Sequence, residues 1–339
     1  FCANSVWKGY YGSGYFRFRP LHQVHAELLT ARRRYRVRRI LFMDDVFTIN
    51  RSYLEGLLPW LRRQVGAAYE IGTHPAAFDA RTARLLKNTG CDLVSFGVQT
   101  YDETLRRDRL HRPESNRIID HALRCCEQAG LPYKVDILFD FDGDSPAAQE
   151  ETVLRLAGRK PFRINQFFYT HFPGTRMLQR CLIQGKISGE RLEAIEEGRE
   201  DSYFAFDMDD HDRRLHYRGI VNLLKIKPLF AGSTVRKLVS TRWYTALALV
   251  PKPLMLIPEL LVALLHRHSL LLIELQHYWN RIRQRAVELA QFLLPALARI
   301  LTRLLNKQPV PPRIPASHGE TCREQRSHRV TGTQSCLSK

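Results

Sequence analysis

Two adjacent carboxylates, Asp44 and Asp45, directly follow a short apolar run at residues 40–43. Such a run is typical of a strand in a parallel sheet, because both faces of that sheet are buried. Ligands of α/β folds usually bind at the edge where these strands end. An acidic pair is also common in a solvated turn, so the rest of the chain has to decide between a site and a turn.

Polar side chains follow the other predicted strands as well. We expect these strands at residues 68–73, 93–96, 133–139 and 162–169. The polar residues near their ends are His74, Gln99, the run 136–144 and His171. In a barrel of parallel strands, all these positions would face one mouth. The residues alone therefore predict an α/β barrel-like domain with a polar mouth, and they indicate no particular chemistry.

Helices alternate with these strands along the chain. They are expected at residues 21–35, 51–65, 80–88, 117–128 and 146–157. Asn50, Asp79 and Ser145 are suitable N-caps for three of them, and Gly90 and Gly130 close two. Regular alternation predicts parallel βα units, and both a barrel-like (β/α) fold and a doubly wound sheet fit it. No G-x-G-x-x-G or Walker A motif follows a strand, which argues against dinucleotide and P-loop chemistry.

The charge balance is strongly basic. The 339 residues include 52 Lys and Arg against 34 Asp and Glu, for a net charge of +18. This basicity suits an anionic partner such as nucleic acid or anionic lipid, or simply a solvated basic face. Nucleic acid is the less favoured partner, because no basic motif interleaved with aromatic residues is present. Seven irregularly spaced Cys point to a reducing compartment, the cytoplasm.

The chain changes character after residue 175. Residues 244–275 are unusually apolar, but three prolines interrupt them, and a membrane span needs about 20 continuous apolar residues. We expect helices that lie on a membrane or pack on the main domain. The predicted divisions are a core at 1–175, its extension at 176–243, an apolar and basic helical region at 244–306 and a disordered tail at 307–339. Two local predictions are a loop at 1–20 and a helix at 177–198.

Taken in order, the short motifs resemble the radical S-adenosylmethionine (SAM) enzymes, most of all the class with a cobalamin-binding domain ahead of the radical core. The resemblance covers about residues 1–175. Its motifs are FC at the start, ILFMDDVFTIN at 40–50, VSFGVQT at 94–100, LHRPESN at 110–116, YKVDILFDFDGDS at 133–145 and FFYTHFPGT at 167–175.

The resemblance implies an α/β fold, a partial parallel (β/α) barrel with a helical C-terminal extension. In that family a C-x-x-x-C-x-φ-C motif follows the first strand, and its three thiolates hold a [4Fe–4S] cluster, a task that suits soft anionic ligands. Phe1 matches the φ position and Cys2 the last cysteine. The first strand and the first two cysteines have no counterpart, so we expect the chain to be an N-terminally truncated fragment.

Further positions carry over from the family one by one. Asp44 and Asp45 match residues that contact the amino group of SAM, and Gln99 matches a polar residue that meets its ribose or methionine part. Arg112 matches an arginine that can pair with the methionine carboxylate. Asp136 begins a stretch whose backbone contacts the cofactor in the family. Here that stretch reads FDFDGDS where the family usually has a Gly and Pro-Gly-Glu-Thr.

The function implied is generation of a 5′-deoxyadenosyl radical from SAM by the reduced cluster, followed by hydrogen abstraction. Methyl transfer or rearrangement with cobalamin is a variant of it. The implied partners are a small-molecule or lipid-like substrate, a reductant such as flavodoxin or ferredoxin, and an anionic membrane surface. Two alternatives stay open: a catalytically inactive barrel that binds membranes peripherally, and a nucleic-acid-modifying or nucleic-acid-binding protein.

Overall fold

The computed structural model describes residues 2–12, 17–199, 211–265, 279 and 283. Residues Phe1–Leu271 form one compact unit, which contains almost all of this described part. Phe1, most of the apolar and basic helical region predicted at 244–306 and the whole tail predicted at 307–339 lie outside the described residues. The predicted divisions at 175, 243 and 306 stay predictions.

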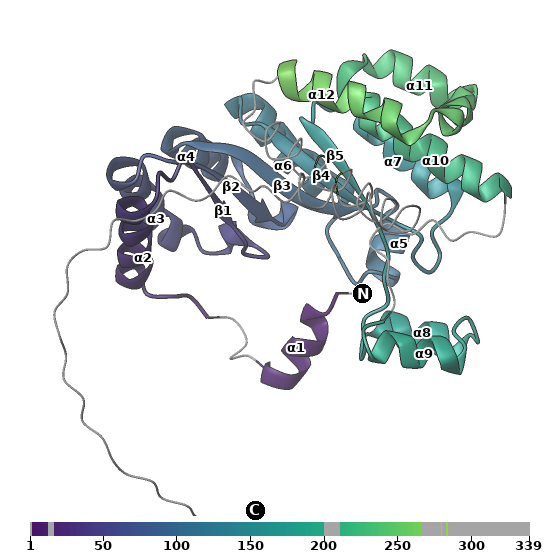
Figure 1. Cartoon of the computed structure of the whole chain (residues 1–339), viewed down its shortest axis with the longest axis horizontal. Coiled ribbons are helices and arrows are strands. Elements are labelled where there is room, and N and C mark those ends of the chain that lie inside the picture. The colour runs from purple at the N-terminus through teal and green to yellow at the C-terminus, as the bar shows by residue number, and fades with distance from the viewer. Residues whose placement is uncertain (1, 13–16, 200–210, 266–278, 280–282, 284–339) are drawn as a thin grey trace, which may run out of the picture. The chain divides into compact units, whose positions relative to one another are not determined.

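Five parallel strands form a single sheet in the order β1-β2-β3-β4-β5 (Figure 1). They are β1 (Arg39–Phe42), β2 (Ala68–Thr73), β3 (Cys91–Gln99), β4 (Tyr133–Phe139) and β5 (Arg163–Phe168). Strands that are neighbours in the sheet are also neighbours in sequence. A doubly wound sheet reverses its strand order partway across, so this order selects the barrel-like alternative and confirms the predicted α/β class.

Helices cover one face of the sheet and build the main core with it. They include α2 (Leu21–Arg34), α3 (Arg51–Gln64), α4 (Ala80–Thr89), α6 (Asn116–Ala129) and α7 (Pro146–Ala157). The apolar face of α3 shows why they pack there: Leu54, Leu57, Leu58 and Leu61 are all at most 1% exposed. Burial of each contributes roughly 1.5–3 kcal/mol, which outweighs the cost of Pro59 inside this helix. The short helix α5 (Glu103–Asp108) instead packs its Leu105 in a smaller cluster with Leu110, Leu138, Phe141 and Met177.

The opposite face of the sheet is polar. Glu70 is buried there and forms ion pairs with Arg39, at 3.0 Å, and with Lys134. Nearer the carboxyl ends, Asp136 accepts hydrogen bonds from Ser95 at 2.9 Å and from Asn165 at 2.7 Å. Every one of these buried charges has a partner, as burial demands. A polar concave face leaves room for a polar ligand at its open end.

The N-terminal segment is a helix and not the predicted loop. Helix α1 (Asn4–Tyr11) begins without a side-chain cap and ends at Gly12, whose φ of 59° suits glycine. Trp7 and Tyr11 stack one turn apart, with ring centroids 6.2 Å apart. The glycines and aromatic residues of this segment led to the loop prediction, which was wrong for these eight residues.

The C-terminal part is helical, as predicted, but more finely divided. The predicted helix 177–198 is two helices, because Gly185 breaks it with a φ of 67°. The elements are α8 (Arg176–Ile183), α9 (Gly189–Glu196), α10 (His211–Ile226), α11 (Gly232–Ser240), η5 (Trp243–Leu249), η6 (Lys252–Met255) and α12 (Leu256–Leu265). Among the described residues, none of these helices has the length and apolar character that crossing a membrane needs.

Candidate functional site

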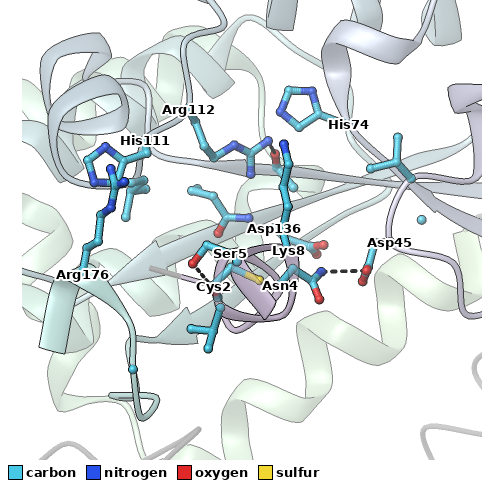
Figure 2. A pocket seen from close by; sticks show the side chains of 18 of the residues that line it. Cys2, Asn4, Ser5, Lys8, Asp45, His74, His111, Arg112, Asp136 and Arg176 are labelled. Atoms are coloured by element: carbon cyan, nitrogen blue, oxygen red, sulfur yellow. Dashed lines mark hydrogen bonds between the residues drawn. The ribbon is translucent and has the colours of Figure 1, made fainter. Parts of the chain in front are cut away.

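A pocket of about 1090 Å³ opens at the carboxyl ends of the strands (Figure 2). Helix α1 forms one wall, and the start of α8 and the loop before α6 form others. Its volume slightly exceeds the usual range for a single small-molecule site, about 300–1,000 Å³, so it can hold a cofactor and a substrate together. Its polar lining is Cys2, Asn4, Ser5, Lys8, Asp45, Thr73, His74, Ser95, Gln99, His111, Arg112, Asp136, Arg176 and Gln179.

The fold brings most of the predicted site residues to this pocket. Those that line it are Cys2, Asp45, Gln99, Arg112 and Asp136, from five separate segments of the chain. Asp44 is exposed and is not part of the lining, although its backbone oxygen lies against Gly72. His171 also lies apart from the lining and packs edge-on against Tyr169. Phe1 is outside the described residues. Whether any of them binds a cofactor stays a prediction.

Asp45 links the end of β1 to the N-terminal helix. Its Oδ2 accepts a hydrogen bond of 2.7 Å from Asn4 Nδ2 (Figure 2). No other hydrogen bond to Asp45 occurs within the described part of the chain, so Oδ1 can accept from a ligand. An exposed carboxylate at this place can bind an ammonium group.

Arg112 is held by a buried carboxylate. Its Nε donates to Glu114 Oε1 at 2.9 Å and its Nη2 donates to the Gly97 carbonyl at 2.6 Å. Burial alone would raise the pKa of Glu114, but hydrogen bonding from His74 and the charge of Arg112 lower it overall, so Glu114 stays ionised. His74 Nε2 lies 3.4 Å from Glu114 Oε1. These contacts leave Arg112 Nη1 for a ligand, because a guanidinium carries five donors in a fixed plane.

The end of β3 has a special backbone that places Gln99. Gln99 has a φ of 70°, an uncommon and strained value for a residue with a side chain. The pairing of β3 with β4 shifts register between Gly97 and Gln99, as a bulge does. A Cβ on residue 97 would lie 2.9 Å from Gln99 Nε2 and 3.4 Å from Arg112 Nη1. Glycine at 97 therefore makes room for both side chains at the pocket.

Asp136 lies on the pocket floor and is fully engaged by protein groups. Burial raises its pKa, although the hydrogen bonds from Asn165 and Ser95 oppose that change. Both carboxylate oxygens thus already accept a hydrogen bond. Asp136 supports the sheet face under the pocket more directly than it could contact a ligand.

The rest of the acidic run turns away from the pocket. Asp142 forms ion pairs with Lys186, Arg109 and Arg180. Asp144 accepts hydrogen bonds from other parts of the chain, and burial raises its pKa to about 6. Across the described residues, no group of three His, Cys, Asp or Glu side chains is placed to hold a metal ion.

The thiols in the described part of the chain are dispersed. Cys2 is the one that lines the pocket, and it is half-buried. The other described thiols are buried elsewhere, at Cys91, Cys125, Cys126 and Cys181. A cubane cluster needs several thiolates at one point, so the described residues do not complete a cluster site. The carboxylate of Asp45, the guanidinium of Arg112 and the amide of Gln99 do fit a zwitterionic ligand such as SAM.

Further polar residues line the pocket that sequence reasoning did not single out, among them Lys8, His111, Arg176 and Gln179. Lys8 lies in the segment that was predicted to be a loop, which hid its place on a helix facing the pocket. Arg176 and His111 belong to a chain rich in basic residues, where a single cation has no distinguishing pattern. Of these residues, only His111 could have been found from the sequence, because the motif LHRPESN places it beside the predicted site residue Arg112.

Comparison with known proteins agrees with the predicted resemblance. The sequence pattern of the radical SAM superfamily matches residues 1–156. The oxygen-independent coproporphyrinogen III oxidase of Pseudomonas aeruginosa is 28% identical over 132 residues, covering 38% of this chain and 28% of that protein. An uncharacterised methyltransferase of Pyrococcus horikoshii is 22% identical over 184 residues, which cover 54% of this chain and 39% of that protein. The chain thus spans well under half the length of both curated relatives.

Among solved structures, one neighbour is the radical SAM methyltransferase TsrM from Kitasatospora setae, determined with cobalamin and a [4Fe–4S] cluster bound. The similarity has a TM-score of 0.44 at 19% identity, and covers 49% of this chain and 34% of TsrM.

Proposed function

We propose, from the premise that residues 1–156 are a domain of the radical SAM superfamily, that this chain binds SAM in the pocket at the carboxyl edge of its sheet. The observation that carries the proposal is the convergence of Asp45, Gln99 and Arg112 on one cavity from three separate segments, namely the ends of β1 and β3 and the loop before α6. In this assignment the free oxygen of Asp45 accepts from the amino group of SAM. Arg112 donates to its carboxylate, and Gln99 meets the ribose or methionine part.

The reaction we propose is hydrogen abstraction from a bound substrate, with methyl transfer or rearrangement as the cobalamin-dependent variant. A [4Fe–4S] cluster would supply the electron that cleaves SAM, and Cys2 is the residue of this chain that could ligate it. An electron donor such as flavodoxin or ferredoxin is then a required partner. The contribution of the described residues is to bind and orient SAM next to the substrate volume of the pocket.

We expect the substitution Arg112→Ala to weaken SAM binding by about one to two orders of magnitude. A hydrogen bond to a charged group contributes roughly 1.5–3 kcal/mol, and every 1.4 kcal/mol is tenfold in affinity. The measurement is isothermal calorimetry on the purified chain. Arg117→Ala is the matched control, because Arg117 is an exposed arginine on α6 that does not line the pocket.

SAM affinity that is the same for Arg112→Ala and for the control would exclude this role of Arg112. Because Arg112 also neutralises the buried Glu114, the unfolding transition of each variant has to be recorded as well. Arg112→Lys separates the loss of SAM binding from the loss of stability. Lysine keeps a positive charge beside Glu114 but lacks the planar guanidinium group. It should therefore be more stable than Arg112→Ala but bind SAM no more tightly.

A second candidate activity, docking on an anionic membrane, is favoured by the surface of the C-terminal region. Large apolar side chains are exposed from η5 to α12, namely Trp243, Leu249, Leu254, Ile257, Leu261 and Leu264. Arg236, Lys237 and Arg242 are exposed next to the start of this run and form no ion pair within the described residues. Apolar insertion combined with basic residues, each worth about 1 kcal/mol, is how peripheral proteins bind anionic lipid.

If this surface docks, the double substitution Leu249→Ser/Leu261→Ser should reduce vesicle binding at least tenfold, since burying each leucine contributes roughly 1.5–3 kcal/mol. Flotation with phosphatidylserine vesicles measures it. The matched control is Leu154→Ser/Ile183→Ser, which removes two exposed apolar residues elsewhere. The docking proposal is wrong if the wild-type chain does not float with the vesicles at low salt, or if both double variants lose the same amount of vesicle binding. The apolar run would then be a surface that packs within the protein.

A further inference from the structure

The pocket has more positive charge than its own carboxylates neutralise. Asp45 and Asp136 are the carboxylates that line it, and both are hydrogen-bonded by the protein. Arg112 is paired with Glu114. Lys8 and Arg176 also line the pocket, yet neither side chain forms an ion pair or hydrogen bond with any other described residue. With SAM assigned to Asp45 and Arg112, these two cations remain without a partner.

The two uncompensated cations face the same cavity because two distant segments pack together. Lys8 comes from α1, and Arg176 is the first residue of α8. Gly174, just before α8, has a φ of 73°, and a Cβ there would lie 3.3 Å from Val6 Cγ1. Glycine at 174 therefore lets α1 close onto the loop that leads into α8. In Figure 2, Lys8 reaches into the middle of the pocket, and Arg176 lies on the side away from Asp45.

His111 adds a third group at the Arg176 side of the pocket (Figure 2). Its backbone φ is 53°, an uncommon value for a residue with a side chain, and such strain often occurs at functional positions. Burial lowers the pKa of His111, and nearby positive charges that include Arg176 and Arg180 lower it further. The neutral ring can donate a hydrogen bond. The direction of its pKa agrees with a positive potential on this side of the pocket, which Asp108 opposes without reversing the shift.

We infer that the substrate that shares this pocket with SAM is an anion, whose carboxylate or phosphate group binds among Lys8, His111 and Arg176. This inference rests on the proposed function, because it starts from the cations that remain once SAM has been assigned. Arginine matches the planar geometry of carboxylate and phosphate with two donors, and lysine adds a point charge. A cleft lined by one sign of charge also concentrates an anionic substrate.

The test is calorimetry with two probes, citrate for carboxylates and pyrophosphate for phosphates, each titrated into the chain saturated with SAM at fixed ionic strength. We expect at least one probe to bind at millimolar concentration or below. Lys8→Gln and Arg176→Gln should each weaken that binding about tenfold, and SAM affinity should change less than twofold. Arg33→Gln/Arg34→Gln is the control, because it removes two exposed charges on α2, away from the pocket.

The outcomes distinguish a failure of the inferred anion site from a failure of the proposed SAM-binding function. If neither probe binds, or the control weakens binding as much as the pocket variants do, the inference is wrong and the proposed function is unaffected. If the probe displaces SAM, or Lys8→Gln weakens SAM instead, these cations belong to the cofactor site, which also overturns the inference. If SAM fails to bind the wild-type chain while a probe still binds through Lys8 and Arg176, the anion site stands and the proposed function fails. The better-bound probe identifies the chemical class of the substrate.

Discussion

Replacing Arg106 with methionine is expected to lower the free energy of unfolding by about 3–5 kcal/mol, the usual loss when one partner is removed from a buried, hydrogen-bonded charge cluster. Arg106 is completely buried on α5. Its Nη1 donates to the Thr100 carbonyl at 2.6 Å, and its Nε and Nη2 donate to the Glu114 carbonyl at 3.0 and 2.7 Å. The substitution leaves two buried carbonyls without a donor, and methionine fills the volume without replacing them.

The consequence reaches the candidate site because both carbonyls belong to segments that carry pocket residues. Thr100 directly follows Gln99 at the end of β3, and Glu114 ends the loop with His111 and Arg112. The backbone N–H of Arg112 also donates to the Arg106 carbonyl at 3.0 Å. Arg106 therefore holds two walls of the pocket in register, although it does not line the pocket itself.

Urea unfolding of the purified chain measures this effect. The neighbouring Arg107 is the matched control, since it is exposed and pairs with Asp108 alone among the described residues. Arg107→Met should leave the urea unfolding transition essentially unchanged, because an exposed ion pair contributes little to stability. The stability of Arg106→Lys should lie between that of Arg106→Met and that of Arg107→Met, because one ammonium group cannot reach both carbonyls. Similar stability for the Arg106 and Arg107 variants would contradict the role assigned to Arg106.

The parallel sheet could be predicted because its signals are local and agree with one another. Strands β2 and β4 were predicted to the residue, since each is a mostly apolar run bounded by polar or turn-forming residues. Helix α7 was also predicted to the residue, because Ser145 caps it and Pro146 occupies its first turn. The strand order was left open, because it depends on which strands pair in space and not on any local pattern.

The parts that could not be predicted depend on long-range packing. The sequence around Arg106 is rich in charge, so a solvated face was the natural reading, and only the fold shows that this arginine is buried. Lys8 was missed for a related reason: α1 has little helical signal of its own and contacts the rest through Asn4, Val6 and the pocket. Residues that act through distant partners leave no periodic trace in a single sequence.

The loop that follows β4 is a second place where a buried ionisable group joins distant segments of the chain. Asp144 Oδ2 accepts hydrogen bonds from the Asp140 backbone N–H at 2.9 Å, from Gln149 Nε2 at 2.7 Å and from the Tyr217 hydroxyl at 3.1 Å. It thereby joins the loop to α7 and α10. Gln149 continues the contact, because its Oε1 lies 2.9 Å from Nε2 of the buried His216. The desolvation of Asp144 outweighs these hydrogen bonds and raises its pKa to about 6.

The raised pKa predicts that Asp144 destabilises the folded chain as the pH rises. Between about pH 4 and 6 the folded state keeps a proton that the unfolded state has lost, so its contribution to the free energy of unfolding falls across that window. A shift of about two pKa units corresponds to roughly 3 kcal/mol. This destabilisation of the folded state is absent below about pH 4 and complete above about pH 6. Relative to Asp144→Asn, which cannot titrate, the wild-type chain should therefore lose about 3 kcal/mol between pH 4 and 7.

Urea unfolding of both proteins at several pH values measures this difference, and comparing them cancels the titration of Asp136 and Glu114, whose pKa values are also shifted. Glu151→Gln is the control, because it removes an exposed carboxylate from α7 and should leave the wild-type pH profile in place. Asparagine can still accept the hydrogen bonds that hold the loop, so a constant offset between Asp144→Asn and wild type is compatible with the argument. A difference that does not vary between pH 4 and 7 would show that desolvation does not control this carboxylate, and that its three hydrogen bonds compensate its burial.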